Sequence, residues 1–549
     1  MLLSGLGAFI AIAGVAGLIF LFQRDDRDME VSQASVPTES AITATPDAAD
    51  SQNQEAIKRE LGGFLPTNPY AMVNWPKPVL ENAAFDILKF VEAPPAEENA
   101  APFYLDALFE FSPELEPCFV GAPNLSDRLV AIKERVKLDK VFAKPYSAEN
   151  AAEWKNTLKL YDEGFNKMVL AQKRPKCMFQ HDFSYLPLCR PEVGAYKFGQ
   201  IASYRATVNL KEGDFSTPLQ VVEMMLRLHR DLRKSNSSRF VDDGLEVLVE
   251  GTIRQMFLTP GIKMEHCDQL LSRLDRHFRE LGDNTLSELK TRYIFQRAFV
   301  YELMSHTGYF SRDRIRENAK KSGGWIAMNS DTAESLFAAM AYSSLAAPNA
   351  KNPNESRAIY MEKFKSAAAS TDLKREFQFI DQLFQSDLSL ASKPFPEKWA
   401  EIRQRCEGIW VGDELDMSKF YLAYLTVSND QYSLYNRTSD GTKLPALKAL
   451  VALHGWRIKH KGKVPSSLEE VMKDSGYPNL PIDSFSNMPL RLTVLKGEPV
   501  IYSVGPNGVD DQAKIESSFY LQPDPVTRRP NDPTKSKGDL VFRLPSALK

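Results

Sequence analysis

Seven histidines are the residues of this sequence that could act as metal ligands or as general acid–base groups. No two of them lie four residues apart with an acid between them, so the helical H-E-x-x-H zinc pattern is missing. His266 and His277 are about three helical turns apart and could share a helix face, but not one metal ion. We therefore interpret the histidines as structural. They are His181, His229, His266, His277, His306, His454 and His460.

Carboxylates and serines give weaker signals. Glu246 and Glu250 would share one face of a helix, either for acid–base work or, as is more common, as a solvated acidic face. Ser287 and Lys290 fit the S-x-x-K pattern of serine acyl-enzymes, but they lie in a helical run without the partner motifs. No nucleophile elbow, phosphate-binding loop or dinucleotide fingerprint occurs. The sequence names no catalytic residues and leaves open whether the chain is an enzyme.

Composition limits the classes of protein to which the chain can belong. Its 549 residues include 68 Lys and Arg and 71 Asp and Glu, which gives a formal net charge of −3. This balance argues against a nucleic-acid partner, because nucleic-acid binders carry a basic excess. With 43% hydrophobic and 25% charged residues, the chain is globular, and collagen, coiled-coil and disulfide-scaffold classes are excluded.

The first 22 residues carry no charged side chain and would span roughly 33 Å as a helix, close to the hydrocarbon thickness of a bilayer. Because no basic residue precedes this run, we expect an uncleaved single transmembrane helix over 1–23, and a cleaved signal peptide is the alternative. The following residues, 24–56, are rich in Ser, Thr, Ala, Pro and acids and predict a disordered linker. The sequence thus predicts a cell-membrane protein with the membrane as partner and its bulk on the extracytoplasmic side.

Residues 57–440 show helical periodicity and little strand-type alternation. They predict a mostly α body of stacked helical hairpins. In one segment Leu219, Val222 and Met225 face a core while Arg230 and Lys234 face outward or close the end of the helix. The segments are 150–172, 217–234, 264–281, 285–304, 331–346, 356–369, 371–385 and 396–406.

The five cysteines form no C-x-x-C motif, which excludes zinc-ribbon and thioredoxin patterns. Cys177 and Cys189 bracket a short loop and would pair in an oxidising compartment. Buried, reduced thiols are the alternative, and we favour it slightly.

The pattern changes near residue 440. A helix over 444–460 is followed by a short capped helix, by a turn over 481–486, and by two strand-like runs at 490–495 and 499–504 that predict a β-hairpin. The second run leads into a loop that contains glycine, Asn507, Asp510 and Asp511. We expect a small α+β lobe over 441–549.

This order resembles the globular end of the major pseudopilin of type II secretion, general secretion pathway protein G. The family's motifs match Gly462 to Val471, Asp483 to Pro489 and Tyr502 to Asp511, and a late Gly538-Asp539-Leu540 resembles its closing acidic step. The likeness covers about 100 residues. The chain departs from the family at its start, because Met1 to Phe22 holds neither a prepilin-peptidase site nor an acid. We therefore expect no polymerisation into a pseudopilus.

The overall layout also resembles a group of uncharacterised planctomycete proteins. These share an N-terminal membrane segment, a helical body, this ending, and a motif like the one that runs from Asn99 to Tyr104. The resemblance implies an architecture and a source, but no activity.

By resemblance to the pseudopilin loop, Asn507, Asp510, Asp511 and Asp539 are candidate ligands for Ca²⁺, which takes six to eight oxygen ligands. The chain departs from the family here too, with Asn507 in place of a charged residue and a longer spacing to Asp539. The alternative is a solvated turn rich in Asn, Gly and Asp.

Three hypotheses for the function remain. The leading one is a membrane-tethered, non-enzymatic scaffold or interaction protein with a protein partner. The second is an extracytoplasmic enzyme of the hydrolase class, which predicts acids or histidines with perturbed pKa values inside the helical body. The third is a secretion- or pilus-associated protein, which predicts an exposed apolar surface on the lobe.

Overall fold

The chain divides into two compact units, Met1–Thr45 and Pro46–Lys549, and every residue described below belongs to the second. These residues are mostly helical, with a few short strands. The computed structural model describes residues 76–95, 97–119, 124–179, 191–235, 242–305, 372–407, 410–411, 414–415, 430–517 and 532–544.

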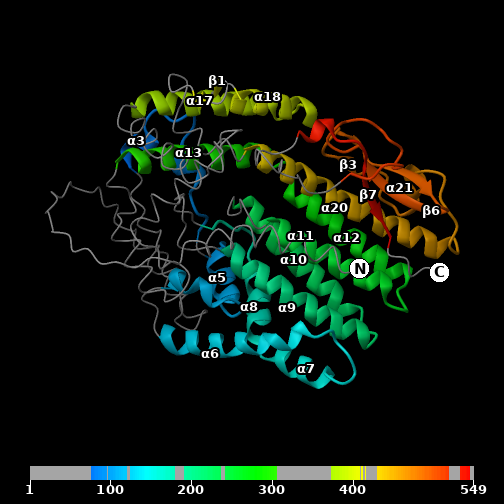
Figure 1. Cartoon of the computed structure of the whole chain (residues 1–549). Helices are drawn as coiled ribbons and strands as arrows, with labels where there is room; N and C mark the ends of the chain where they lie inside the picture. Colours follow the sequence, from blue (N-terminus) through cyan, green and yellow to red (C-terminus); the bar gives the residue numbers. More distant parts are fainter. Residues whose placement is uncertain are drawn as a thin grey trace. The chain divides into compact units, whose positions relative to one another are not determined.

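The colours of Figure 1 follow the described helices along the chain, from blue to red. Three are short 3-10 helices: η1 (Pro113–Phe119), η2 (Leu138–Ala143) and η3 (Pro533–Lys535). The α-helices are α3 (Lys77–Leu80), α4 (Ile87–Phe90), α5 (Ala101–Phe109), α6 (Leu125–Lys137), α7 (Ala151–Lys159), α8 (Asp162–Ala171), α9 (Pro191–Lys211), α10 (Ser216–Lys234), α11 (Asp242–Leu258), α12 (Met264–Leu281), α13 (Thr285–Ser305), α17 (Leu373–Leu390), α18 (Phe395–Glu407), α20 (Asp430–Lys459) and α21 (Leu468–Asp474).

The described strands form three small antiparallel sheets. In the largest, of order β5-β6-β7, Thr493 pairs with Val500, and Ile501 pairs in turn with Phe542. The predicted hairpin is therefore present, with a third strand added from near the end of the chain. The strands are β1 (Trp410–Val411), β2 (Glu414–Leu415), β3 (Ile482–Asp483), β4 (Met488–Pro489), β5 (Arg491–Leu495), β6 (Glu498–Ser503) and β7 (Leu540–Arg543).

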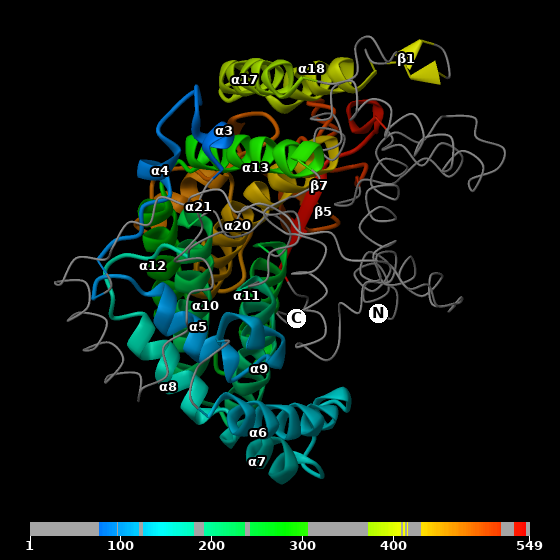
Figure 2. The same ribbon diagram turned by 90° about the vertical axis from the view of Figure 1, so that its left-hand side faces the viewer.

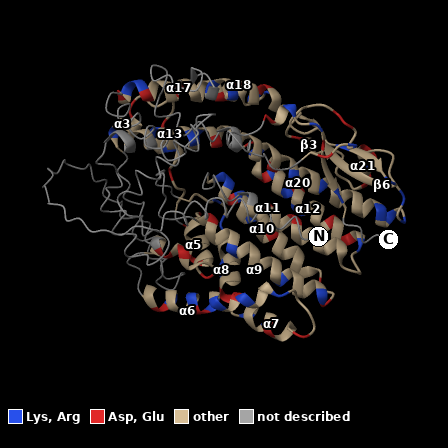
Figure 3. Cartoon of the chain, in the orientation of Figure 1, with Lys and Arg blue, Asp and Glu red and all other residues tan. Residues whose placement is uncertain are grey.

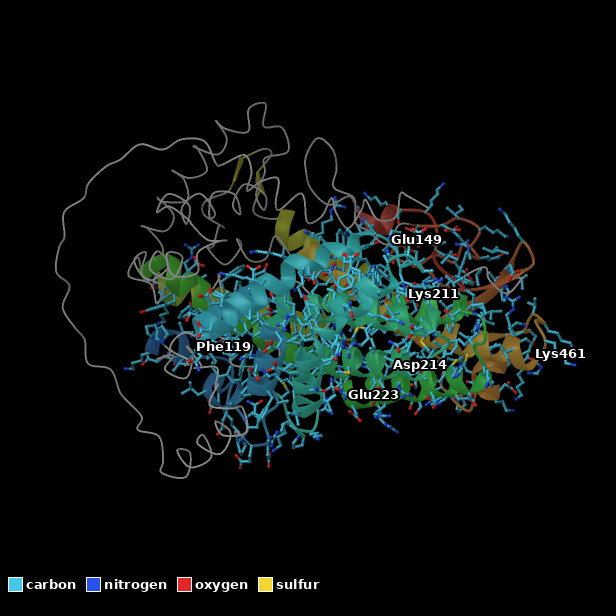
Figure 4. The ribbon with its side chains drawn as sticks, turned by 90° about the horizontal axis from the view of Figure 1, so that it is seen from below. Phe119, Glu149, Lys211, Asp214, Glu223 and Lys461 are labelled. Carbon is cyan, nitrogen blue, oxygen red and sulfur yellow. The ribbon has the colours of Figure 1, made fainter. Side chains whose placement is uncertain are left out.

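Several helices form where the apolar pattern and capping residues require them. The predicted 217–234 is α10, in which Leu219, Val222 and Met225 are buried. The predicted 150–172 is divided into α7 and α8. Asp214, labelled in Figure 4, lies just before α10, and its carboxylate accepts hydrogen bonds from the backbone N–H and hydroxyl of Ser216. The predicted helices 331–346 and 356–369 lie outside the described residues.

An extended hydrophobic core runs through the described part of the unit. Its buried members extend from Ala100, just before α5, to Phe542 on β7. In Figure 1, α9, α10, α11 and α12 lie side by side, and α20 follows α12 toward the sheet. A Cβ at Gly455 of α20 would lie 3.2 Å from the Cβ of Cys267 on α12, so the glycine allows these two helices to approach closely. Figure 2 shows α17 beside α13.

Helix α20 connects the lobe to the body. It contacts α11, α12 and α18 of the body and α21, β3, β6 and β7 of the lobe. Lys448 forms an ion pair of 2.8 Å with Asp275 on α12, and the Arg254 guanidinium of α11 donates to the carbonyl of Arg543 at the end of β7. The lobe is therefore packed on the body along one continuous helix.

The expected transmembrane helix requires a correction. Residues 1–23 and the predicted linker 24–56 lie outside the described residues. Among the described helices none is both long and apolar enough to cross a bilayer, and even the 30-residue α20 carries several charged side chains. We correct the fold class to a mostly helical chain with small antiparallel sheets. The membrane helix, the membrane as partner and the cell-membrane location are not carried forward.

Candidate functional site

The structure brings the residues of the predicted calcium loop together. Asp539 is buried just before β7, and its carboxylate accepts hydrogen bonds from the backbone N–H groups of Asp511 (3.3 Å) and Ala513 (2.6 Å). In return, the Asp511 carboxylate accepts from the backbone N–H of Gly538 at 2.8 Å. These reciprocal bonds join the loop that follows β6 to the segment that precedes β7.

The other two predicted ligands bond within the same region. The Asn507 side-chain amide donates to the carbonyl of Ser536 at 2.8 Å. Asp510 pairs with Arg491 of β5 and accepts from the backbone N–H of Gln512. All four side chains therefore make bonds that hold the loop in place.

The carboxylates do not converge on one point. Within the described part of the chain no group of three or more His, Cys, Asp or Glu side chains could hold a metal ion. Burial raises the pKa of Asp539, and the nearby charges of Asp510 and Asp511 raise it further, against the lowering effect of the two backbone donors. The calcium site stays a prediction that rests on resemblance alone.

Calcium is therefore expected to have little effect on stability. The full chain should change its unfolding temperature by less than about 2 °C between EDTA and millimolar calcium, because the carboxylates already have partners. A larger rise that is lost in Asp510→Ala with Asp511→Ala would instead establish a calcium loop. Thermal unfolding followed by circular dichroism makes the measurement.

Gly538 is the residue of this loop that tolerates substitution least. Its φ is +104°, and an added Cβ would lie 2.8 Å from the carbonyl oxygen of Ile515. Gly538→Ala is therefore expected to lower the free energy of unfolding by about 3 kcal/mol. Gly497→Ala is the matched control, since Gly497 also has a positive φ (+83°) but its Cβ would meet nothing within 4 Å. Equal losses in urea unfolding of the two variants would contradict the close-approach argument.

The two other pseudopilin-like motifs have structural roles here. Ser467 caps α21, where its hydroxyl accepts from the backbone N–H of Glu470, and Leu468 and Val471 are buried. Asp483 is buried at the end of β3, and its carboxylate accepts from the hydroxyl of Ser503 at the end of β6. Burial raises the pKa of Asp483, against several hydrogen bonds that lower it.

The Asn99–Tyr104 motif also acts structurally. The Asn99 side chain accepts from the backbone N–H groups of Ala101 and Met178 and donates to the Met178 carbonyl, so it ties the start of α5 to a distant segment. The Tyr104 hydroxyl donates to the buried Asp231 carboxylate of α10 at 2.7 Å. The motif thus positions α5 against α10.

A buried ion cluster joins α5 to α6 and α8. Glu110, just after α5, pairs with Arg128 at 2.5 Å, with Arg135 at 2.7 Å and with Lys167 at 2.9 Å. Asp106, one turn earlier, pairs with Arg128 at 2.6 Å. Burial would raise the pKa of Glu110, but the three cations outweigh it and lower the pKa to about 2. The cluster compensates its charges internally and holds α6 against α5.

A second buried polar cluster, which we call the His–Glu cluster, lies in the body. It consists of His229 on α10, Glu246 on α11 and His277 on α12, all 6% exposed or less. The Nε2 of His229 lies 3.0 Å from a carboxylate oxygen of Glu246, and the two imidazole rings are 5.2 Å apart. The Nδ1 of His277 lies 3.1 Å from the carbonyl of Leu226, which fixes that ring.

Burial raises the pKa of Glu246 to about 8, and the neighbouring charge of Asp440 on α20 adds to the effect. Burial, with the charges of His229 and Arg230, lowers the pKa of His277. A carboxyl group that holds its proton at neutral pH, beside neutral imidazole, is suited to proton transfer. Because all three side chains are buried, a substrate would reach them only after a movement of the helices.

All three residues of this cluster were named from the sequence, but it was not predicted that they meet. Glu246 and Glu250 were expected to share one helix face, either for acid–base work or, as is more common, as a solvated acidic face. Only Glu250 lies toward the surface, where it pairs with Arg254 at 2.7 Å. The spacing alone cannot show that His229 of α10 meets Glu246. Among the other described histidines, His454 stacks on Phe257, and burial lowers its pKa to about 4.

Two further predictions can be compared with the structure. Ser287 and Lys290 of the S-x-x-K match lie in α13, and the Lys290 ammonium lies over the ring of Phe85 at 4.9 Å. Cys177 is a free thiol, so it does not pair with Cys189. Cys118 is disulfide-bonded.

Comparisons of the chain with protein-family models, with characterised proteins and with solved structures found no match. They support neither a role in type II secretion nor a planctomycete source, and we do not carry these two expectations forward. The likeness of the lobe to the pseudopilin end stays a prediction.

Proposed function

We propose that the chain is a rigid, non-enzymatic scaffold that presents its 441–549 lobe to a protein partner. The observation that carries the proposal is the packing of α20. This helix belongs at once to the body core and to the lobe, so it couples the lobe directly to the body. Direct coupling of this kind is what a scaffold requires.

The surface of the lobe is compatible with a protein partner. It exposes several large apolar side chains, at 41% to 58% of their area. Figure 3 shows basic and acidic residues interspersed along the described elements. The exposed apolar residues of the lobe are Val464, Ile482, Met488, Val494, Val509 and Ile515.

Site-specific photo-crosslinking in the native cell tests the proposal. A photoreactive amino acid at Met488 or Val494 of the full chain should give one discrete adduct of the same mass. The same group at Leu160 or Val169, which are exposed to similar extents on the body, should not give it. Met488→Asp should abolish the adduct formed at Val494 and leave the unfolding temperature unchanged. Identical adducts, or none, at lobe and body positions would contradict the proposal.

The His–Glu cluster favours a second candidate, an enzyme of the hydrolase class with its site in the body. The observation behind it is the coincidence of a raised carboxyl pKa and two histidines at one buried place. Assays of the full chain on ester, phosphate-ester and glycoside substrates should then show turnover that Glu246→Gln removes and Glu250→Gln keeps. Turnover that ignores Glu246, or none on any of these substrates, would argue against this candidate.

A further inference from the structure

The His–Glu cluster is poorly supplied with hydrogen bonds. The second carboxyl oxygen of Glu246, Nε2 of His277 and the hydroxyl of Ser439 on α20 are buried without a hydrogen-bond partner in the described part of the chain. Each of these residues is at least nine-tenths buried. Buried polar atoms normally have hydrogen-bond partners, so these exceptions on adjacent helices need a physical explanation.

We propose that the His–Glu cluster is a proton-operated latch, which holds the first turns of α20 against α11 while Glu246 is protonated and releases them when its proton leaves. The inference goes beyond the scaffold proposal and does not depend on which partner the lobe binds.

The charged groups around Glu246 show why loss of the proton is disruptive. From α20, Asp440 is buried and faces Glu246 with a like charge. The two cations that could offset a new carboxylate are already paired, Lys443 with Asp440 at 2.6 Å and Arg233 with Glu288 of α13 at 2.6 Å. A carboxylate formed in this place would have the His229 imidazole of α10 at 3.0 Å, but it would be buried beside the like charge of Asp440.

The remaining neighbours cannot supply the missing charge. Arg230 of α10 pairs with Glu280 of α12 at 2.8 Å, and Glu250, on the same helix as Glu246, adds another negative charge. His277 keeps its neutral form in the folded chain, because burial and its cationic neighbours lower its pKa. Movement of α20 away from α11 separates Asp440 from Glu246 and admits water to both. Hydration then removes the free-energy cost of the two buried negative charges.

The sign of the effect follows from proton linkage. Burial raises the pKa of Glu246 from 4.5 to about 8, so the closed state binds the proton more tightly than the open state. Closure is therefore favoured at low pH, and its advantage is lost as the pH rises from 4.5 through about 8. The more C-terminal turns of α20 stay attached, since Lys448 remains paired with Asp275 on α12.

Hydrogen exchange of the full chain tests the latch. Peptides that cover residues 434–446 are compared at about pH 6.5 and about pH 9, with labelling times scaled to cancel the intrinsic pH dependence of exchange. A Glu246 pKa of 4.5 in the open state and about 8 in the closed state predicts a change in the equilibrium constant for opening of this segment. The constant should be about thirtyfold larger at the higher pH. Amides of α9, which contributes none of the ionisable groups around Glu246 named above, are expected to change little.

Matched variants distinguish the latch from an unspecific loss of stability at high pH. Glu246→Gln, which cannot ionise, should abolish the rise, and Glu250→Gln should retain it. Asp440→Asn removes the like charge, so Glu246 ionises more easily and the midpoint should move to lower pH. Exchange of 434–446 in the wild-type chain that is equal at both pH values overturns the proposal even if Glu246→Gln fails to fold. A rise that persists in Glu246→Gln also overturns it.

Discussion

Replacing Glu110 with glutamine is expected to lower the free energy of unfolding at neutral pH by about 3 kcal/mol. Three cations, Arg128, Arg135 and Lys167, converge on this one buried carboxylate. Glutamine keeps the size of the side chain but removes the charge, so all three cations would lose a charged partner, and only Arg128 and Lys167 would keep Asp106. Urea unfolding of the wild-type and variant chains measures the difference.

The same change should alter the response to acid. Because the ion pairs lower the pKa of Glu110 from 4.5 to about 2, its contribution to stability is present above 4.5 and is lost as the pH falls toward 2. Glu110→Gln should remove that part of the acid sensitivity. Glu163→Gln is the matched control, since Glu163 pairs with the same Lys167 but is 68% exposed, and it should cost less than about 1 kcal/mol. Equal effects of the two variants would show that the buried cluster contributes no more than a surface pair.

Asp483→Ala is expected to lower the free energy of unfolding by roughly 3 to 4 kcal/mol, about as much as Glu110→Gln. The Asp483 carboxylate accepts four hydrogen bonds that connect the turn before β4 with the end of β6, and the side chain is 1% exposed. Alanine would leave buried donors without an acceptor, which costs more than the bonds contribute. The donors are the backbone N–H groups of Phe485 and Val504 and the hydroxyls of Ser486 and Ser503.

Two control variants show whether the loss in Asp483→Ala comes from its buried hydrogen bonds. Asp483→Asn keeps one acceptor oxygen but turns an amide N–H₂ toward existing donors, so its cost should lie between those of the wild type and alanine. Asp474→Ala, which removes a surface ion pair with Lys459 in the same lobe, should cost less than about 1 kcal/mol. Unfolding free energies from urea titrations rank the three variants, and a loss in Asp483→Ala no greater than that in Asp474→Ala would contradict the prediction.

Amphipathic helices could be predicted from the sequence because one face of each is buried. For α12, the predicted 264–281 coincides with the observed Met264–Leu281. Helix α9 was missed because it is covered on several sides. Gly194 packs on Leu108 and Leu115, while Gly199 packs on Leu245 and Leu248, so its apolar and small residues do not follow one stripe.

The limits for the sites have a similar physical origin. The hairpin of β5 and β6 is local and leaves its period-two pattern in the sequence, but β7 joins the sheet from about forty residues further along the chain, and no local pattern records that pairing. The His–Glu cluster depends on side chains from three helices, and whether Glu246 faces a core or water is decided only when α10 and α20 pack against α11. Spacing within one helix contains no such information.

The continuous core has a consequence for synthesis of the chain on the ribosome. Phe103 and Leu108 of α5 belong to the same core as Ile501 and Phe542, so the apolar interior stays incomplete until almost the whole chain has emerged. At ordinary elongation rates of about 5 to 20 residues per second, the earlier helices would expose apolar surface for tens of seconds. Such a nascent chain depends on chaperones more than a chain whose N-terminal part can complete a hydrophobic core by itself. Products truncated before α20 are expected to be degraded.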